Sequence, residues 1–255
     1  MTASTRPLAV VTGAGSGIGE QYARRYAREG YDLVLVARSA PRLRSLGNEL
    51  HRSHGIDVRT LDVDLATRTG TARLVDALAD LPRLDHLVNC AAVADEGDLV
   101  RAEAAELRRV IDLNVAALTE LTRAAVVRMR AQSGGTIVNV AAAAAYQPMP
   151  HMAAYAATKS YVLQFTEAVA EENRAHGVRV LAVSPGGTDT PMNPGAGRGK
   201  RTARNVVDTT WRALSRRTPS VVDGAANAVL AQLASRLFPR WFRLRVAERM
   251  MRDRA

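Results

Sequence analysis

The sequence predicts a single doubly wound α/β domain, with a mostly parallel seven-stranded sheet and helices on both faces. Three observations lead to this fold class. The chain has 255 residues, a usual size for one α/β domain and a small one for two. Apolar, strand-like runs alternate with helical patterns, as they do in successive βαβ units. These runs lack strict apolar/polar alternation, which is expected when helices cover both faces of a sheet.

The first half of the chain contains four strand-like runs separated by helical segments. The runs that we interpret as strands are 8–13, 32–38, 58–65 and 86–92. Helices are expected at about 18–29 and 68–80, with one more between the second and third strands. This part therefore has the order βαβαβαβ, which is typical of a parallel sheet.

The second half continues the alternation and then becomes basic. The expected elements are two helical stretches within 103–131, a strand at 134–140, a helix at 153–175 and a strand at 178–187. Residues 191–205 are rich in Pro, Gly and Arg, and we expect a mobile loop there. The remaining expected elements are a helix at 205–215, a strand at 220–222, a helix at 223–235 and a helix after Pro239.

The composition excludes several classes of protein. With 47% hydrophobic and 24% charged residues, the chain is neither collagen-like, nor a coiled coil, nor wholly disordered. Its single cysteine, Cys90, rules out an intramolecular disulfide and a cysteine-based zinc site, so no metal is expected. One cysteine suits a reducing compartment, and we expect a cytoplasmic protein. We expect neither a membrane span nor a cleaved signal peptide.

The net charge of +10 is concentrated near the end of the chain. Residues 198–255 contain 14 of the 35 basic residues and only 4 of the 25 acidic ones. Within them, the basic C-terminal segment 236–255 sets aromatic and aliphatic side chains among arginines. We interpret this segment first as an oligomer-contact helix, with an acidic membrane surface as the alternative. Nucleic-acid binding is not expected, because basic charge alone does not indicate it.

The motif TGAGSGIG at 12–19 lies between a predicted strand and a predicted helix. This context is typical of a dinucleotide-binding loop, in which glycines allow a tight turn, close approach to the pyrophosphate and helix–strand contact. The free N–H groups of the helix N-terminus favour a bound phosphate. The residues of the loop expected to contact the dinucleotide are Gly13, Ser16, Gly17, Ile18 and Gly19.

The ends of the second and third strands indicate which dinucleotide binds. An acidic residue at the end of the second strand would bind a ribose 2′-hydroxyl, but the sequence there is Ala37, Arg38, Ser39. Arg38 can hold a 2′-phosphate through two hydrogen bonds, so we predict NADP(H); the alternative is a solvated surface arginine. After the third strand, Asp64 or Asp62 can accept a hydrogen bond from the adenine amino group, and we expect Asp64 because it ends the run.

Tyr155 and Lys159 are four residues apart on a predicted helix and therefore share one face. A nearby cation favours the phenolate, so we expect the tyrosine pKa to fall from about 10 toward neutrality and the phenol to act as an acid and base. Only two of the 35 basic residues are lysines, which makes a lysine here unusual for this chain. The alternative is an exposed pair without function.

Four features together resemble the short-chain dehydrogenase/reductase family: TGAGSGIG, Asn114, YAATK at 155–159, and SPGGTDT at 184–190. The resemblance covers residues 8–190, and the tail is similar to bacterial reductases allied to the ketoacyl and hydroxysteroid reductases. It implies a Rossmann-type domain, a small-molecule substrate and a homodimer or homotetramer. It also implies that segment 191–205 closes over the substrate, where its Lys200, Arg201 and neighbouring arginines 198 and 204 would attract an anion. The alternative is a solvated charged flap that contacts the cofactor phosphates or nothing.

The resemblance also implies roles for individual residues. Tyr155 would protonate the substrate oxygen, Lys159 would hold the nicotinamide ribose, and Asn114 would anchor a proton-relay water. Further cofactor contacts are implied on either side of the helix that carries the tyrosine. They are Asn89 beside the adenine, Pro185, Gly186 and Thr188 at the nicotinamide carboxamide, and Thr190 beside the phosphates.

The sequence departs from the family pattern in two places. Asn89 matches the first position of the family's NNAG motif, but the chain continues with Cys90, Ala91 and Ala92, so two of the four positions differ; packing beside the adenine should tolerate this.

The larger departure concerns the catalytic serine. Ala142 stands 13 residues before Tyr155, where the family has a serine that donates a hydrogen bond to the reacting oxygen. Loss of such a donor typically costs a factor of about 10²–10³ in rate. Three explanations are open. Tyr146, Gln147 or His151 replaces the donor; the substrate is an imine that needs none; or turnover is weak or absent, naturally or through an introduced serine-to-alanine change.

The function predicted from these observations is NADPH-dependent reduction of a carbonyl or C=N group in a small biosynthetic or lipid-like molecule. Two alternatives follow from the missing serine. One is a non-redox enzyme, such as a cyclase, dehydratase or epimerase, that keeps the tyrosine as an acid and base. The other is an NADP-binding protein without turnover.

Overall fold

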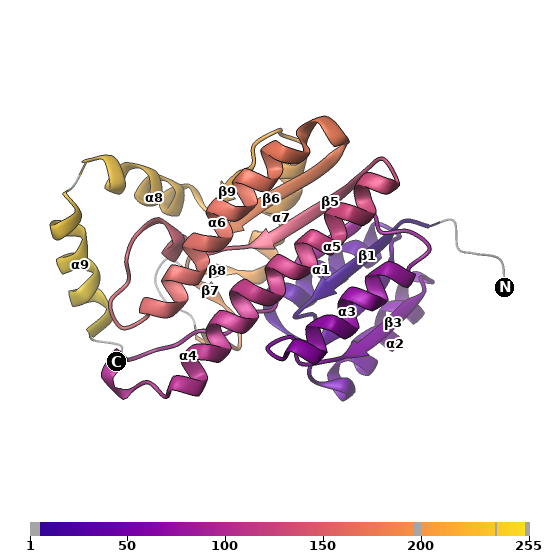
Figure 1. Ribbon diagram of the computed structural model, residues 1–255, viewed down its shortest axis with the longest axis horizontal. Coiled ribbons are helices and arrows are strands. Elements are labelled where there is room, and N and C mark those ends of the chain that lie inside the picture. Colours follow the sequence, from indigo (N-terminus) through magenta and orange to yellow (C-terminus); the bar gives the residue numbers. More distant parts are fainter. Residues whose placement is uncertain (1–5, 196–199, 238, 253–255) are drawn as a thin grey trace.

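The computed structural model describes residues 6–195, 200–237 and 239–252 (Figure 1). Residues 196–199 of the expected lid, which include Arg198, and residues 238 and 253–255 of the basic C-terminal segment lie outside the described residues.

Seven strands form one sheet, and every pairing between neighbours in it is parallel. The strand order is β3-β2-β1-β4-β5-β6-β9. The strands are β1 (Leu8–Thr12), β2 (Asp32–Ala37), β3 (Val58–Asp62), β4 (His86–Asn89), β5 (Gly135–Val140), β6 (Val178–Ser184) and β9 (Ser220–Val222). The predicted fold class is confirmed. Because the order reverses between β1 and β4, the sheet has a switch point at the carboxyl end of β1, where such folds bind ligands.

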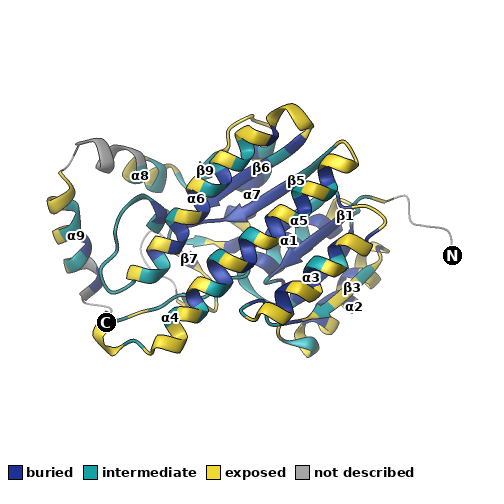
Figure 2. Cartoon of the chain, in the orientation of Figure 1, coloured by how far each residue is buried: buried dark blue, intermediate teal, exposed yellow. Residues whose placement is uncertain are grey.

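Helices cover both faces of this sheet (Figure 1). One buried cluster joins the sheet to side chains of α1 (Gly17–Arg28), α2 (Ala40–His54) and α7 (Ala203–Leu214). A second cluster on the opposite face involves α3 (Arg68–Asp80), α5 (Leu118–Ala131) and α6 (Ala153–Asn173). In β1 all five residues are buried, and Val10 pairs with Val34 on one side and Leu87 on the other. Figure 2 shows the inner strands of the sheet buried between two half-exposed helical layers, whereas the edge strand β3 is partly exposed.

The helical stretch 103–131 is interrupted in its middle. After α4 (Ala104–Ile111) the chain makes a π-helical turn over Asp112–Ala117 before α5 begins. Such turns are rare in proteins, and those that do occur are often found at functional sites. The turn contains Asn114, one of the predicted site residues.

The segment 191–205 contains regular structure that the sequence did not predict. Two short strands, β7 (Thr188–Asp189) and β8 (Arg201–Thr202), pair across it, and an isolated bridge joins Thr190 to Asn193. The helix α7, expected from residue 205, already begins at Ala203. The described ends of this segment are therefore fixed by backbone hydrogen bonds.

Two helices complete the chain: α8 (Ala225–Leu237) and α9 (Arg240–Arg252). In Figure 1 they lie on the side of the sheet that carries β9, away from β3 and α2. In the part of the chain that the structure describes, every helix is too short or too polar to cross a lipid bilayer.

Candidate active site

A cleft of about 1270 Å³ opens at the carboxyl edge of the sheet. The glycine loop, Tyr155, Lys159 and the turn 185–190 all line it, although they come from distant parts of the sequence. Side chains of α8 and α9 line its far side. The cleft is larger than the roughly 300–1,000 Å³ usual for one small ligand, so it has room for two.

The glycine loop forms a backbone cradle, and any side chain in place of its glycines would fill the space inside it. Gly13 has a φ of +69°, and a Cβ atom there would lie 2.9 Å from the backbone nitrogen of Ala91. Gly17 has a φ of +58°, and a Cβ atom on Gly19 would lie 2.2 Å from the carbonyl oxygen of Gly13. Because only glycine is free of strain at these positions, the loop fits the phosphates of a dinucleotide. Ser16 and Ile18, the other predicted loop residues, also line the cleft.

Arg38 and Asp64, the residues predicted to contact the adenosine part of the cofactor, both line the cleft. Arg38 is exposed and has Arg42 as a second cationic neighbour along the cleft wall. Asp64 forms a 2.9 Å ion pair with Arg109. Burial opposes ionisation of this carboxyl, but the Ala66 backbone N–H and the Arg109 guanidinium outweigh it, so the pKa of Asp64 is lowered.

Tyr155 and Lys159 lie in the first two turns of α6. The Lys159 Nζ atom lies 5.7 Å from the Tyr155 ring centroid and donates a 2.8 Å hydrogen bond to the carbonyl oxygen of Val140. The Asp95 carboxylate lies at the start of the helix. It accepts hydrogen bonds from the backbone N–H groups of Ala154, at 3.3 Å, and Tyr155, at 2.6 Å. These bonds satisfy N–H groups that the first turn of a helix leaves free.

The expected lowering of the Tyr155 pKa does not occur in this structure. Burial raises the pKa of Tyr155 to about 12, with a smaller contribution from Cys90. Burial also lowers the pKa of Lys159 to about 8. The prediction was wrong here because it considered the charge of Lys159 and neglected the cost of desolvating the phenolate, which is the larger effect. At neutral pH the phenol therefore carries its proton.

Two asparagines assigned to the site bond to neighbouring elements instead of lining the cleft. Asn114 donates to the carbonyl oxygen of Val93 at 2.8 Å and to Thr158 Oγ1 at 3.1 Å, and it accepts from the Val93 backbone N–H at 3.0 Å. Asn89 donates to Asn139 Oδ1 at 2.9 Å. The side chain of Asn114 thus connects the π-helical turn to α6, and that of Asn89 connects β4 to β5.

The turn after β6 contacts both the glycine loop and α8. A Cβ atom on Gly17 would lie 3.3 Å from Thr190, so Thr190 is next to the phosphate cradle. A Cβ atom on Gly186 would lie 2.1 Å from Asn227 Nδ2, so a side chain at position 186 would displace the Asn227 amide. Thr188 Oγ1 donates to the Gly186 carbonyl oxygen at 3.1 Å. Pro185, Gly186, Thr188 and Thr190 all line the cleft.

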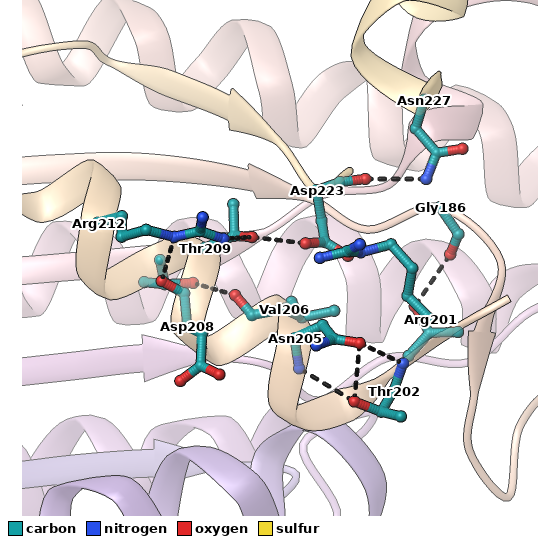
Figure 3. Close-up of polar contacts among 12 residues, drawn as sticks. Gly186, Arg201, Thr202, Asn205, Val206, Asp208, Thr209, Arg212, Asp223 and Asn227 are labelled. Carbon is teal, nitrogen blue, oxygen red and sulfur yellow. Dashed lines mark hydrogen bonds and ion pairs between the residues drawn. The ribbon is translucent and has the colours of Figure 1, made fainter. Parts of the chain in front are cut away.

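A polar network around Asp223 anchors the far end of the expected lid (Figure 3). The fully buried Asp223 carboxylate accepts from Arg201 Nε at 2.6 Å and from Thr209 Oγ1 at 2.6 Å. Asn227 donates to the Asp223 carbonyl oxygen at 2.8 Å. Arg201 was expected to attract substrate, but its charge is paired with a carboxylate. Lys200, from the same expectation, donates to the carbonyl oxygens of residues 193 and 194.

Ala142 lines the cleft, as do the three residues considered as replacements for the missing serine. Tyr146 packs against an apolar cluster that includes Ala145, and burial raises the pKa of its phenol. Gln147 Nε2 lies 3.5 Å from the sulfur of Met149. His151 has a φ of 62°, and its Nε2 lies 3.1 Å from Glu248 Oε2 without the alignment of a hydrogen bond.

Sequence reasoning missed three residues of the site: Asp95, Asn227 and Arg243. Asp95 lies 60 positions before Tyr155, and no local motif connects them. Asn227 and Arg243 belong to helices beyond β9 that reach the cleft only through tertiary packing. The basic composition of the C-terminal segment was the single available signal for Arg243.

A doubly wound sheet with a phosphate cradle and a tyrosine–lysine helix at its carboxyl edge defines a class of nicotinamide-dependent oxidoreductases. Within this class the chain belongs to the short-chain dehydrogenase family, whose model matches residues 7–201, which confirms the resemblance seen in the sequence. An uncharacterised oxidoreductase of Staphylococcus epidermidis is 30% identical over 212 residues, covering 82% of this chain and 90% of the relative.

Two solved structures show how far the similarity extends. A short-chain dehydrogenase from Sphingobium yanoikuyae in complex with NADPH has a TM-score of 0.83 and 31% identity, over 97% of this chain and 95% of the other. The bulky-bulky ketone specific alcohol dehydrogenase from Comamonas testosteroni has a TM-score of 0.82 and 28% identity, over 91% of this chain and 93% of the other. The similarity therefore includes the C-terminal helices.

Proposed function

We propose that the protein reduces a carbonyl or C=N group of a small, lipid-like molecule with NADPH. The observation that carries the proposal is that Tyr155 and Lys159 line the same cleft as the glycine cradle. The phenol retains its proton at neutral pH, because burial raises the pKa of Tyr155 to about 12. A protonated phenol is an acid ready to donate to the substrate, which suits reduction better than oxidation.

Each part of the site has a role in this reaction. When bound, the nicotinamide supplies the hydride. Tyr155 donates its proton to the oxygen or nitrogen that accepts the electron pair, and Lys159 places a positive charge near the phenolate that remains. The 2.8 Å bond to the Val140 carbonyl oxygen holds the Lys159 ammonium in place. Asp95 and Asn114 fix the position of α6 through their hydrogen bonds at Tyr155 and Thr158.

The choice of NADPH over NADH rests on Arg38. This arginine lines the adenine end of the cleft beside Arg42, and the strand end that carries it has no carboxylate. Two guanidinium groups suit a 2′-phosphate and offer nothing specific to a free 2′-hydroxyl. The NADPH complex of the Sphingobium yanoikuyae dehydrogenase supports the same choice.

Ala142 favours C=N reduction as a second candidate. It is 7% exposed, lines the cleft and presents a methyl group where a ketone would need a hydrogen-bond donor. An imine that takes the Tyr155 proton on nitrogen becomes an iminium cation, and hydride addition to its carbon gives a neutral amine, so no oxyanion forms and a second donor is not required. Ketone reduction through Tyr155 alone would be slower.

NADPH consumption with a panel of ketones and cyclic imines tests the proposal. We expect substrate-dependent oxidation of NADPH by the full chain, with a stoichiometric amount of reduced product, and its loss in Tyr155→Phe. The phenylalanine variant keeps the ring and should bind NADPH as tightly as the wild type. If product forms without NADPH consumption, the protein is a non-redox enzyme; if NADPH binds and no product forms, it is a binding protein.

A homodimer or homotetramer completes the proposal. The outer face of α9 carries Trp241 and Val246, which are 60% and 43% exposed, and such apolar side chains are common in subunit contacts. Measurement of the mass in solution tests this. A monomer that binds vesicles of acidic lipids would instead support the membrane alternative for the basic segment.

A further inference from the structure

Among the described residues, one cation that lines the cleft has a buried hydrogen-bond donor without a partner. Arg243 on α9 lines the cleft, and its Nε atom is buried with no hydrogen-bond acceptor among the described residues. Lys159 and Lys200 also line the cleft, but both donate to backbone carbonyl oxygens. A buried donor without a partner is uncommon and points to a group that binds there.

The inward position of Arg243 follows from the helix that carries it. Residues 243, 247 and 251 recur at intervals of four and share one face of α9. Ala247 and Met251 on this face are 2% and 8% exposed. Arg245 and Arg249 lie on the opposite face and are exposed. Of these three arginines on α9, Arg243 is therefore the one that the helix turns toward the cleft.

The helix α9 is held against the loop that precedes α6. His151 lies in this loop, and its Nε2 is 3.1 Å from Glu248 on α9. The backbone of the same loop is fixed by the Gly97 N–H, which donates to the His151 carbonyl oxygen at 2.9 Å. Since α6 begins two residues after His151, Arg243 and Tyr155 are carried by elements that contact each other.

Apolar side chains line the cleft together with Arg243 and Tyr155. Met149, Met152, Leu230 and Met251 line it, and flexible methionine side chains adapt to apolar ligands of varied shape. The acidic residues that line the cleft among the described residues are Asp64, which is paired with Arg109, and Glu96, which is exposed. One guanidinium facing an apolar wall matches a single negative charge on an apolar chain, whereas a phosphate dianion would need more cations.

We propose that Arg243 binds the carboxylate of the substrate, which is then an oxo-acid or imino-acid with an apolar chain between the carboxylate and the reducible group. Arg38 is not a competitor for this carboxylate, because it follows β2, on the β3 side of β1, whereas α9 lies on the side of the sheet that carries β9 (Figure 1). Turnover of such an acid presupposes the reductase proposed above, whereas its binding does not.

Steady-state kinetics of Arg243→Met with acids and their neutral amides test the assignment. The probes are straight-chain oxo-acids of increasing length, each compared with its primary amide, with NADPH at saturation. We expect wild-type kcat/KM to favour the best acid over its amide by about tenfold or more, as a charged hydrogen bond would. In Arg243→Met the acid and its amide should have kcat/KM values within about twofold of each other. The change should come from a lower kcat/KM for the acid, with the value for the amide unchanged.

Two further variants separate charge from packing. Arg249→Met changes an exposed arginine on the outer face of the same helix and should leave the ratio of the two kcat/KM values unchanged. Arg243→Lys keeps the positive charge and should therefore keep part of the preference for the acid. If Arg243 acted only through packing, the lysine variant would lose this preference as the methionine variant does. The proposal is overturned if Arg243→Met leaves the ratio intact, if Arg249→Met lowers it equally, or if Arg243→Met weakens NADPH binding, since Arg243 would then serve the cofactor.

A binding measurement distinguishes failure of this proposal from failure of the reductase function. Calorimetric titration of the NADP⁺-loaded full chain with decanoate and with decanamide needs no turnover. Tighter binding of decanoate in the wild type, lost in Arg243→Met, supports the carboxylate site even if no substrate is reduced. Equal affinity for the two ligands in the wild type overturns it even if ketones are reduced.

Discussion

The Asp95 carboxylate accepts a 2.6 Å hydrogen bond from the backbone N–H of Tyr155, 60 residues further along the chain. Asp95 follows β4 and Tyr155 lies in the first turn of α6, so this bond ties the helix that carries the proposed acid to the switch-point edge of the sheet. A carboxylate at this end of a helix also interacts favourably with the helix dipole. The orientation of the phenol therefore depends on a residue that does not itself react.

Asp95→Ala should reduce catalysis more than it reduces stability. Removing an N-terminal cap costs about 1 kcal/mol of unfolding free energy, which leaves most of the protein folded. A loosened first turn should lower kcat about tenfold and leave the KM for NADPH unchanged. Steady-state kinetics and urea denaturation measure the two effects.

Asp98→Ala is the matched control for this substitution. Asp98 lies three residues further along the same loop, and its side chain makes no capping hydrogen bond. It should behave as the wild type does. Equal losses of kcat in the two variants would show that the loop, and not the bond from Tyr155 to Asp95, governs the rate.

Arg38→Ala should weaken NADPH binding by about 10- to 100-fold, because a charged hydrogen bond to the 2′-phosphate is worth about 1.5–3 kcal/mol. Binding of NADH, which lacks this phosphate, should change little. Fluorescence titration with both dinucleotides measures the difference. Arg44→Ala removes another exposed arginine of α2 and should affect neither cofactor. Equal weakening of NADPH and NADH by Arg38→Ala would contradict the assignment to the 2′-phosphate.

Ala142→Ser should distinguish ketone reduction from imine reduction. The new hydroxyl would line the cleft and donate to a developing oxyanion, so we expect kcat/KM for ketones to rise about 100-fold. The kcat/KM for cyclic imines should change by less than about threefold, since no oxyanion forms on them. Ala144→Ser adds a hydroxyl two residues away on the same cleft wall and should have no effect. An unchanged ketone rate in Ala142→Ser would mean that the reaction does not use a donor at this position.

The sheet and the glycine cradle could be predicted well from the sequence, because residues close together along the chain determine them. Apolar runs place the strands to within a few residues, and 220–222 and 68–80 agree with β9 and α3. The glycine motif predicts its own geometry, since the positive φ of Gly13 and the contact of Gly19 with Gly13 follow from residue type and spacing. These features needed no knowledge of distant residues.

The rest of the site depends on contacts between distant residues. No local pattern predicts that Asp95 caps α6 or that Arg243 reaches the cleft. The π-helical turn at Asp112–Ala117 has no compositional signature either. The pKa of Tyr155 was mispredicted for a related reason: spacing in the sequence reveals the nearby Lys159, but burial is a property of the whole fold.

His86 provides a test of the fold that does not involve the proposed reaction. Its ring lies between two tyrosines, with Nδ1 2.8 Å from the hydroxyl of Tyr26 and Nε2 3.4 Å from that of Tyr31. Burial lowers the pKa of His86 to about 4, against the weaker opposing effect of Asp85. The folded protein therefore keeps this imidazole neutral in weak acid.

This shift predicts a specific loss of stability on acidification. In the unfolded chain a histidine binds its proton near pH 6.5, whereas folded His86 does so only near pH 4. Between these values the unfolded state holds more protons, so the unfolding free energy falls as the pH falls, by up to about 3 kcal/mol. Urea denaturation at several pH values should show this slope in the wild type and a smaller one in His86→Gln. His54→Gln, which changes an exposed histidine at the end of α2, should keep the wild-type slope. If His86→Gln and the wild type lose stability equally between about pH 6.5 and 4, the acid sensitivity arises elsewhere.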